Sequence, residues 1–178
     1  DPQGNATSGF GLPKDGDLPT VYECLVNGRG LGEAVHSNVH FPFLSVVSAS
    51  RDLAGAEVEL IEQTDRERVL RKKINALSED YEYVIIDSPP SLGLLTLNAL
   101  AAADSVLIPI QCEFYALEGL SQLLNTIRLV QRSLNQKLDI EGVLLTMYDS
   151  RLNLAKQVAE EAREYFGGKG FETMIPRN

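Results

Sequence analysis

The chain lacks a long hydrophobic run, a secretory leader and an excess of positive charge. Its longest apolar stretches have the length of a strand, far below the roughly 20 residues of a membrane-spanning helix, so we expect no membrane segment. No charged and then apolar leader opens it. A formal net charge of −9 excludes a protein that coats nucleic acid through bulk charge. Any DNA contact must come from a local patch or from residues outside these 178.

Cysteine and histidine are equally scarce, which narrows the chemistry that the chain can support. Cys24 and Cys112 are far apart and form no CxxC pair, so we expect buried or free thiols in the reducing cytosol. His36 and His40 have no Cys or carboxylate partner at ligand spacing, which argues against a zinc-type metal site. The expected location is the cytoplasm.

The composition is that of one ordinary globular domain. Hydrophobic residues make up 44% of the chain and charged residues 23%, and no repeat, low-complexity tract or linker interrupts it. We therefore expect a single, partial domain over residues 1–178. The chain begins at Asp1-Pro2-Gln3-Gly4 without an initiator Met, so we expect a piece of a longer protein.

Short aliphatic runs alternate with segments of helical period. Three runs are continuous, as in strands buried on both faces of a parallel sheet: Val84-Ile85-Ile86, Val106-Leu107-Ile108 and Val143-Leu144-Leu145. The expected strands are Phe43–Ser48, Tyr83–Asp87, Ser105–Gln111, Glu141–Met147 and Phe171–Ile175. The expected helices are Thr20–Asn27, Asp65–Ser78, Leu117–Leu134 and Asn153–Phe166, and the expected loop is Thr7–Pro19. This order predicts a doubly wound α/β fold, with a mostly parallel sheet and helices on both faces.

An acidic residue ends one of the aliphatic runs. The expected strand Tyr83–Asp87 would place the Asp87 carboxylate at the carboxyl edge of the sheet, where open α/β folds bind ligands. In P-loop NTPases, an Asp at this position holds magnesium, directly or through water. Pro89 and Pro90 would stiffen the backbone that follows the expected strand, and Ser91 is placed to cap a helix that begins near Leu92. The alternative is a strand followed by an ordinary capping turn.

The first eight residues form a second polar segment, Asp1-Pro2-Gln3-Gly4-Asn5-Ala6-Thr7-Ser8. Asp and Gln side chains can orient a water molecule, and Gly4 permits close approach of the backbone. Asn5 and Thr7 offer local hydrogen bonds. Taken alone, such a segment is also typical of a surface loop.

Together the two segments resemble the ParA/Soj family of chromosome- and plasmid-partitioning ATPases. Residues 1–9 resemble the family's switch I motif, and residues 84–100 resemble its Walker B and switch II motifs. Three further segments match in family order: residues 50–57, residues 145–151 and Ile175-Pro176-Arg177-Asn178. The resemblance covers essentially the whole chain.

One family motif has no counterpart. The deviant Walker A loop, KGGxGK(T/S)T, lies upstream of the switch I motif in the family, and this chain contains no such sequence. The family also continues beyond its Pro-Arg-Asn motif. The resemblance therefore implies ATPase activity for the parent protein, whereas we expect the 178 residues alone to be inactive.

The resemblance implies a role for individual residues. Asp1 would position the attacking water, and Asp87 would hold the water shell of Mg²⁺. The other residues implied at the nucleotide are Gln3, Gly4, Asn5, Pro89, Pro90, Ser91, Thr146, Met147, Pro176 and Arg177. Of these, Pro89, Pro90 and Ser91 would form the turn that senses the γ-phosphate, and the last four would lie near the adenine. Arg151 would belong to a DNA-facing surface; its alternative is a solvated charge in a loop.

The implied function is a nucleotide switch that segregates DNA. ATP and Mg²⁺ would favour a sandwich homodimer that binds DNA nonspecifically, and slow hydrolysis, stimulated by a ParB-like centromere-binding protein, would dissolve it. The location would be cytoplasmic, on the nucleoid. One alternative is a MinD-like division-site ATPase, which would carry a C-terminal membrane helix. Another is a non-catalytic α/β interaction module. A relative of the nitrogenase iron protein is disfavoured, because residues 92–103 contain no cluster-ligating cysteine.

Overall fold

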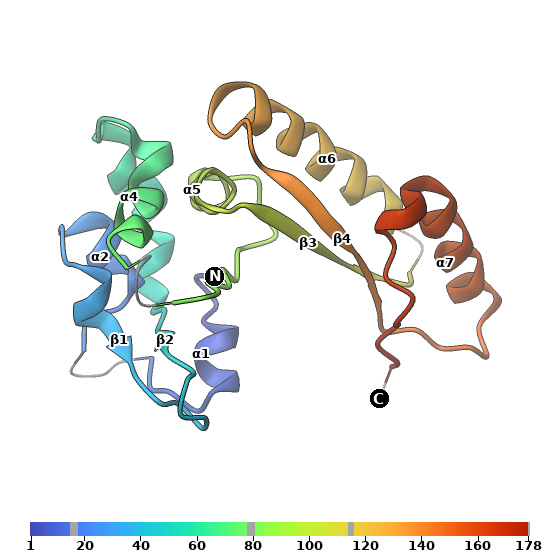
Figure 1. The fold of residues 1–178 in the computed structure, drawn as a ribbon, viewed down its shortest axis with the longest axis horizontal. Helices are drawn as coiled ribbons and strands as arrows, with labels where there is room; N and C mark the ends of the chain where they lie inside the picture. The colour runs from blue at the N-terminus through green and yellow to red at the C-terminus, as the bar shows by residue number, and fades with distance from the viewer. Residues whose placement is uncertain (15–17, 78–80, 114–115, 178) are drawn as a thin grey trace. The chain divides into compact units, whose positions relative to one another are not determined.

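The computed structural model describes residues 1–14, 18–77, 81–113 and 116–177. Contacts group the chain into two compact units, Asp1–Ala102 and Ala103–Asn178 (Figure 1). The expectation of one domain over residues 1–178 stays a prediction. None of the helices in the described part of the chain combines the length and the hydropathy of a membrane span.

The first unit consists of short helices and one small sheet. Its α-helices are α1 (Asn5–Gly9), α2 (Val21–Val26), α3 (Ala56–Glu59), α4 (Val69–Asn75) and α5 (Leu94–Ala102). Its 3₁₀ helices are η1 (Leu31–Ala34), η2 (Arg51–Ala54), η3 (Leu60–Glu62) and η4 (Arg66–Arg68). Strands β1 (Val35–His36) and β2 (Val46–Val47) pair antiparallel. The predicted strand Phe43–Ser48 is thus reduced to β2, and α1 replaces the start of the predicted loop Thr7–Pro19.

Of the two helices predicted in this unit, one forms near its predicted bounds and the other only in part. Thr20 caps α2: its hydroxyl accepts from the Tyr22 backbone N–H at 3.3 Å, and Glu23 accepts from the Thr20 backbone N–H at 2.7 Å. Asp65–Ser78 is wrong as a single helix, because a 3₁₀ turn, η4, precedes α4. Ser78 lies outside the described residues.

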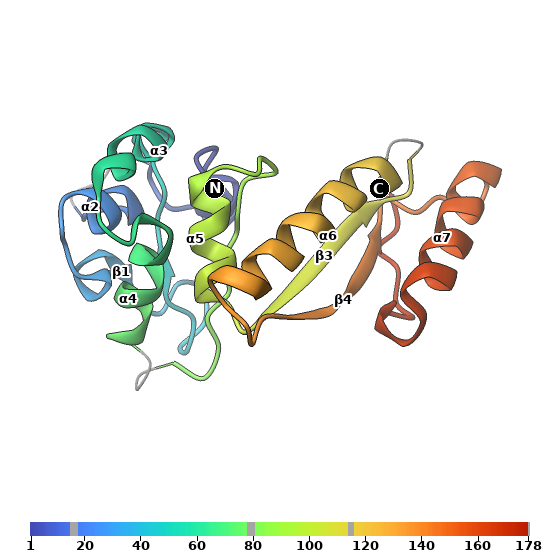
Figure 2. The ribbon, with the colours of Figure 1, turned by 90° about the horizontal axis from the view of Figure 1, so that it is seen from above.

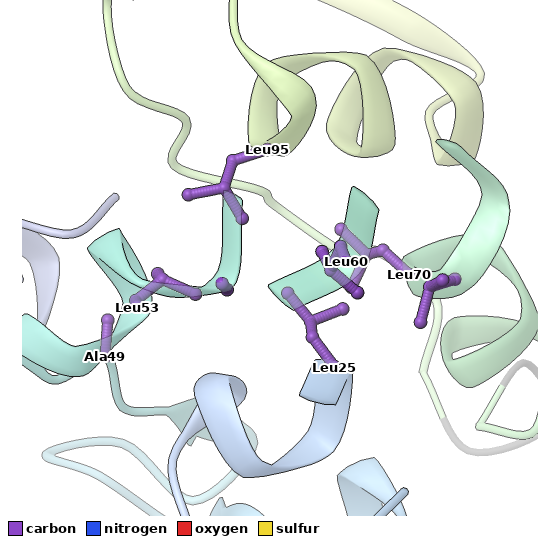
Figure 3. Close-up of a cluster of buried hydrophobic side chains, with 8 residues drawn as sticks. Leu25, Ala49, Leu53, Leu60, Leu70 and Leu95 are labelled. Carbon is purple, nitrogen blue, oxygen red and sulfur yellow. The ribbon is translucent and has the colours of Figure 1, made fainter. Parts of the chain in front are cut away.

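A cluster of buried aliphatic side chains forms the core of the first unit (Figure 3). Its buried members are Leu25, Ala49, Leu53, Ala56, Leu60, Val69, Leu70 and Leu95. Buried Asn98 of α5 links this core to α4: its Oδ1 accepts from the Leu70 N–H at 3.1 Å, and its Nδ2 donates to the Arg66 carbonyl at 2.7 Å. Because both polar ends of this side chain are paired, Asn98 joins two elements without the cost of an unsatisfied buried amide.

The predicted strand Tyr83–Asp87 is wrong as a strand. No strand is present over these residues, and the side chains of Tyr83 and Ile85 are 80% and 95% exposed. Only Ile86 packs against the core cluster. The physical reason is the lack of a neighbour: within the described residues, no strand offers this segment the backbone partners that a sheet requires.

The second unit carries the longer elements. Its strands and helices are β3 (Ser105–Gln111), α6 (Ala116–Ser133), β4 (Asp139–Thr146), α7 (Asn153–Phe166) and the 3₁₀ turn η5 (Gly167–Lys169). Strands β3 and β4 are parallel, and Figures 1 and 2 show α6 running alongside the pair. This strand–helix–strand unit confirms the predicted strands Ser105–Gln111 and Glu141–Met147, and α6 and α7 confirm the predicted helices.

The register of β3 and β4 shifts once, between Val106 and Leu107. After the shift, burial along β3 alternates: Ile108 and Ile110 are 3% and 5% exposed, whereas Leu107 is 49% exposed. The expectation that this run is buried on both faces is therefore wrong, because only one face of β3 is covered in the described part of the chain.

The last predicted strand, Phe171–Ile175, is wrong as a regular strand. The backbone N–H groups of Phe171 and Ile175 donate to the Val143 and Leu145 carbonyls of β4, at 3.0 and 2.8 Å. The acceptors are two residues apart on β4, but the donors are four apart, so the segment cannot follow the strand in register. Isolated bridges form on either side of it, between Gly170 and Val143 and between Pro176 and Tyr148. In all, the described residues form a mixed α/β structure with two small sheets.

Candidate functional site

The Asp1 carboxylate organises the start of the chain. Its Oδ1 accepts from the Gln3 backbone N–H at 3.1 Å, and its Oδ2 accepts from the Asn5 amide at 3.3 Å. The Asp1 carbonyl accepts from the Gly4 N–H at 2.9 Å. The carboxylate is therefore held in one orientation by the residues that follow it, as an Asp at a turn commonly is.

Gly4 lies where a side chain would not fit. Its φ is +60°, in the left-handed region that favours glycine, and a Cβ would meet the Ala49 carbonyl and the Lys14 Cε, each at 3.0 Å. Lys14 Nζ donates to the Gln3 carbonyl at 2.5 Å. Lys14 was missed in the sequence analysis, because a single Lys in a loop carries no pattern.

Buried Thr7 fixes the other end of this segment. Its hydroxyl accepts from the Ala49 backbone N–H at 2.9 Å, across 42 residues of chain. The segment from Asp1 to Thr7 is thus bonded through Thr7 to the residues before η2, and Gly4 lies close to the same residues. This explains why α1 forms where the sequence alone suggested a loop.

Asp1 and Asp87 are brought together by the fold. The backbone nitrogen of Asp1 donates to the Asp87 backbone carbonyl at 2.9 Å, although the two residues are 86 apart in sequence. The Asp87 side chain is exposed. The two predicted acidic residues therefore share one surface of the first unit.

The turn after Asp87 is held by α5. Thr96 Oγ1 lies within donor distance of two carbonyls, that of Ser91 at 2.5 Å and that of Pro89 at 3.3 Å. This contact fixes the backbone that carries Pro89, Pro90 and Ser91. The helix begins at Leu94, close to the predicted start near Leu92.

A second residue missed in the sequence analysis lies at the start of α5. Glu57 of α3 places its carboxylate against Gly93, where a Cβ would collide with it. Glu57 Oε1 also accepts from the Leu95 N–H at 3.5 Å. A carboxylate near a helix N-terminus is electrostatically favourable. Nothing in the local sequence pairs Glu57 with Gly93, because they meet only in the folded unit.

Four predicted residues meet in the second unit. Thr146 ends β4, and its hydroxyl donates to the Ile110 carbonyl of β3 at 3.2 Å. Met147 follows with φ +53°, which is uncommon for a residue other than glycine. Pro176 forms a bridge with Tyr148, and the Arg177 N–H donates to the Tyr148 carbonyl at 3.0 Å. Thr146, Met147, Pro176 and Arg177 therefore gather at the carboxyl end of β4, whereas Asn178 lies outside the described residues.

Arg151 stands in the loop between β4 and α7. Its Nε and Nη2 donate to Asp149 Oδ1 and Oδ2 at 2.9 and 2.7 Å. This two-point hydrogen bond lowers the pKa of the Asp149 carboxyl from 3.8 to about 2. The Arg151 side chain is 87% exposed. The guanidinium is therefore both paired with a carboxylate and exposed to solvent.

The remaining chemistry of the described residues is limited. They contain no group of three or more His, Cys, Asp or Glu side chains that could hold a metal ion. Cys24 and Cys112 are free and buried, as predicted, and burial raises the pKa of both thiols. The candidate residues thus form two sets: one around Asp1 and Asp87 in the first unit, and one at the end of β4 in the second.

Comparisons with known proteins identify the family. An AAA domain family matches residues 1–140. The chromosome partitioning protein ParA of Myxococcus xanthus is 58% identical over 178 residues, which cover the whole chain and 62% of that protein. The sporulation initiation inhibitor protein Soj of Bacillus subtilis is 54% identical over the whole chain and 70% of its own length. The chain thus spans about two thirds of the length of these relatives.

A solved structure extends the comparison to the fold. Cobyrinic acid a,c-diamide synthase from Mycobacterium smegmatis, with bound ADP and magnesium, superposes with a TM-score of 0.90 at 38% identity. The match covers the whole chain and 72% of that protein. The fold is therefore that of a P-loop ATPase. With identities of 58% and 54% to ParA and Soj proteins, the chain belongs to the ParA/Soj family of chromosome-partitioning ATPases.

Proposed function

We propose that the protein carrying this chain is an ATP- and Mg²⁺-dependent ATPase that segregates DNA. The observation that carries the proposal is the contact between Asp1 and Asp87, whose backbone nitrogen and backbone carbonyl oxygen are 2.9 Å apart across 86 residues of sequence. These are the two acidic residues to which the family resemblance gives the attacking water and the metal. Their meeting on one surface supports a single phosphate-handling site.

The residues present fit a magnesium ion. Asp87 offers an exposed carboxylate on a backbone that lies beside that of Asp1, and Mg²⁺ prefers oxygen ligands. Magnesium commonly uses one or two carboxylates and completes its coordination with water and phosphate oxygens, so the absence of a larger ligand cluster in the described residues is compatible with it. When bound, the ion would neutralise charge on the phosphates. Asp87 would hold its water shell.

Asp1 would act by positioning a water molecule. An unperturbed Asp has a pKa near 3.9 and is too weak a base to take a proton efficiently near pH 7. Phosphoryl transfer, however, depends mainly on orientation. The hydrogen bonds from Gln3 and Asn5 hold the Asp1 carboxylate in one direction, as that role requires.

The other residues that would contact the nucleotide belong to the two sets described above, one around Asp1 and Asp87 and one at the end of β4. Gln3, Gly4 and Asn5 would line the phosphate side of the nucleotide. The Pro89, Pro90 and Ser91 turn would sense the γ-phosphate, with its backbone held by Thr96. Thr146, Met147, Pro176 and Arg177 would lie near the adenine. In the whole protein, β3 and β4 would belong to a doubly wound, mostly parallel sheet.

Nucleotide state would control assembly. ATP would favour a sandwich homodimer that binds DNA nonspecifically on the cytoplasmic nucleoid, with Arg151 on the DNA-facing surface. A ParB-like centromere-binding protein would stimulate the slow hydrolysis that dissolves the dimer. The 178 residues alone contain no Walker A motif, and we propose that they do not hydrolyse ATP by themselves.

The test compares aspartate variants in the full-length protein. Asp1→Ala should reduce DNA- and partner-stimulated ATP turnover by about a hundredfold or more while ATP-dependent dimerisation persists, because this side chain orients water and does not hold the nucleotide. Asp87→Ala should also remove the Mg²⁺ dependence of ATP binding. Asp104→Ala, at an exposed aspartate outside both sets, is the matched control and should leave all three properties unchanged.

Two outcomes would contradict the proposal. Parental turnover in Asp1→Ala would remove the assigned catalytic role. If the unaltered full-length protein had no ATPase activity with DNA and partner present, it would be a non-catalytic interaction module.

A further inference from the structure

We propose that Asp149 is a positioning residue that holds the Arg151 guanidinium ready to bind a backbone phosphate of DNA. This inference rests on the proposed function, which places Arg151 on the DNA-facing surface. It assigns to Asp149 a role opposite to the one that its charge suggests, since a carboxylate ordinarily repels DNA.

The Asp149 carboxylate binds the Arg151 guanidinium from the side, along the edge formed by Nε and Nη2. Arg151 Nε and Nη2 donate to the two oxygens of Asp149 at 2.9 and 2.7 Å. A guanidinium bound along this edge keeps Nη1, and the second N–H of Nη2, for another acceptor. Those groups form the end-on fork that matches a phosphate. Because the Arg151 side chain is 87% exposed, an incoming phosphate could reach that fork without breaking the pair.

The carboxylate is anchored independently of the ion pair. Asp149 Oδ1 also accepts from the Arg151 backbone N–H at 3.0 Å, and the Asp149 carbonyl accepts from the Leu152 N–H at 3.0 Å. The Asp149 side chain is only 14% exposed, against 87% for Arg151. Asp149 is thus held in place by the surrounding backbone, whereas the Arg151 guanidinium projects into solvent, where a ligand can reach it.

Preorganisation explains why such a pair would strengthen binding. A free Arg side chain loses substantial rotamer entropy when it is immobilised against a ligand. A carboxylate that already restricts the guanidinium reduces this loss at the moment of binding. The positive charge of Arg177 also acts on Asp149, so the Asp149 carboxylate is partly neutralised by a second cation of the same unit.

The experiment measures affinity of the full-length protein for a short duplex DNA of random sequence, with ATP and Mg²⁺, by fluorescence anisotropy at several salt concentrations. Asp149→Asn should lower the affinity about threefold to tenfold, although the change makes the protein more positive by one charge. Asp104→Asn, at an exposed aspartate in the same unit, makes the same change in net charge and is the matched control. It should leave the affinity unchanged or slightly higher.

A double variant separates positioning from a general structural effect. Arg151→Ala should lower the affinity and make the salt dependence less steep by about one phosphate contact. If Asp149 acts through Arg151, Asp149→Asn should have no further effect in the Arg151→Ala background. A further loss there would indicate a structural role and overturn the inference.

The possible failures are distinguishable. Higher DNA affinity in Asp149→Asn would show that the carboxylate competes with phosphate, which overturns the inference but keeps Arg151 on the DNA surface. Unchanged affinity in Arg151→Ala would instead remove Arg151 from that surface, and with it both the proposed contact and the role of Asp149. Unchanged affinity in Asp149→Asn alone, with a loss in Arg151→Ala, would overturn only the positioning role.

Discussion

Two equally aliphatic segments of this chain adopt different structures: one is a paired strand and the other is not. Val106-Leu107-Ile108 lies in β3 and pairs with β4 in a parallel ladder. Val84-Ile85-Ile86 pairs with no strand in the described part of the chain, and its Ile85 side chain is 95% exposed. The residue types predict a strand in both places. What differs is whether a neighbouring strand supplies hydrogen-bond partners.

The difference shows that aliphatic content alone is not sufficient for a buried strand. Every backbone N–H and C=O of a strand needs a partner, and in a sheet these come from another segment. In the second unit, α6 connects β3 to β4, so the partner is supplied within the unit. The segment around Ile85 is instead held at its carboxyl end, by Ile86 against the core and by the Asp87 carbonyl at Asp1.

The largest expected effect compares the same substitution in the two segments. Ile108→Ala should destabilise the chain by about 2–5 kcal/mol, because the side chain is 3% exposed and its removal leaves a cavity. Ile85→Ala should change the free energy of unfolding by less than about 0.5 kcal/mol. Urea denaturation of the 178-residue chain measures both. Equal losses would mean that Ile85 is buried in solution.

The next comparison uses two glycines of the second unit. Gly142→Ala in β4 should destabilise by about 1–3 kcal/mol, because a Cβ would lie 2.5 Å from the Phe171 ring and 2.8 Å from the Lys169 carbonyl. Gly119→Ala in α6 meets nothing within 4 Å and should stabilise by about 0.5–1 kcal/mol through helix propensity. Thermal unfolding of both variants measures whether each substitution lowers or raises the melting temperature. A neutral Gly142→Ala would show that the contact between β4 and Phe171 is loose.

A third prediction concerns association of the exposed aliphatic segment. We expect the 178-residue chain to self-associate, because unpaired backbone beside exposed aliphatic side chains is a template for strand addition. Ile85→Lys should raise the monomer fraction severalfold in size-exclusion chromatography with light scattering. Val58→Lys is the matched control: Val58 is 70% exposed but lies on α3, so this change should have little effect. A monodisperse monomer of the unaltered chain would refute the prediction.

The smallest expected effect is a shift in a titration. Asp149 should titrate with a pKa of about 2 in the folded chain, below its ordinary value of 3.8, because Arg151 bonds to its ionised form. Since the folded pKa is the lower one, the contribution of the pair to stability is present above about pH 4 and is lost as the pH falls toward 2. NMR titration of the Asp149 carboxyl carbon measures this. In Arg151→Ala the midpoint should return toward 3.8, whereas a midpoint near 3.8 in the unaltered chain would argue against the pair.

Elements with local signals were predictable from the sequence. The capping pair of Thr20 and Glu23 begins α2, and α7 ends before Gly167, whose φ is +53°. Long apolar periodicity located α6. These features depend on hydrogen bonds and side-chain spacings within one segment, so the sequence contains the information needed to recognise them. The ordered family motifs were recognisable for the same reason, since each is a contiguous string.

Contacts between distant segments were decided only by the folded chain. The strand predicted over Tyr83–Asp87 does not form, because no neighbouring strand in the described residues pairs with it. The strand predicted over Phe171–Ile175 does not form, because its backbone donors and their acceptors on β4 are spaced differently. Lys14 at Gln3 and Glu57 at Gly93 could not be found in advance, because neither belongs to a motif with its partner. Asp1 and Asp87 were both singled out from their own segments, but their meeting required the fold to close 86 residues of chain. Sequence patterns identify residues suited to a site, whereas hydrogen bonds and packing between distant segments determine which of them meet.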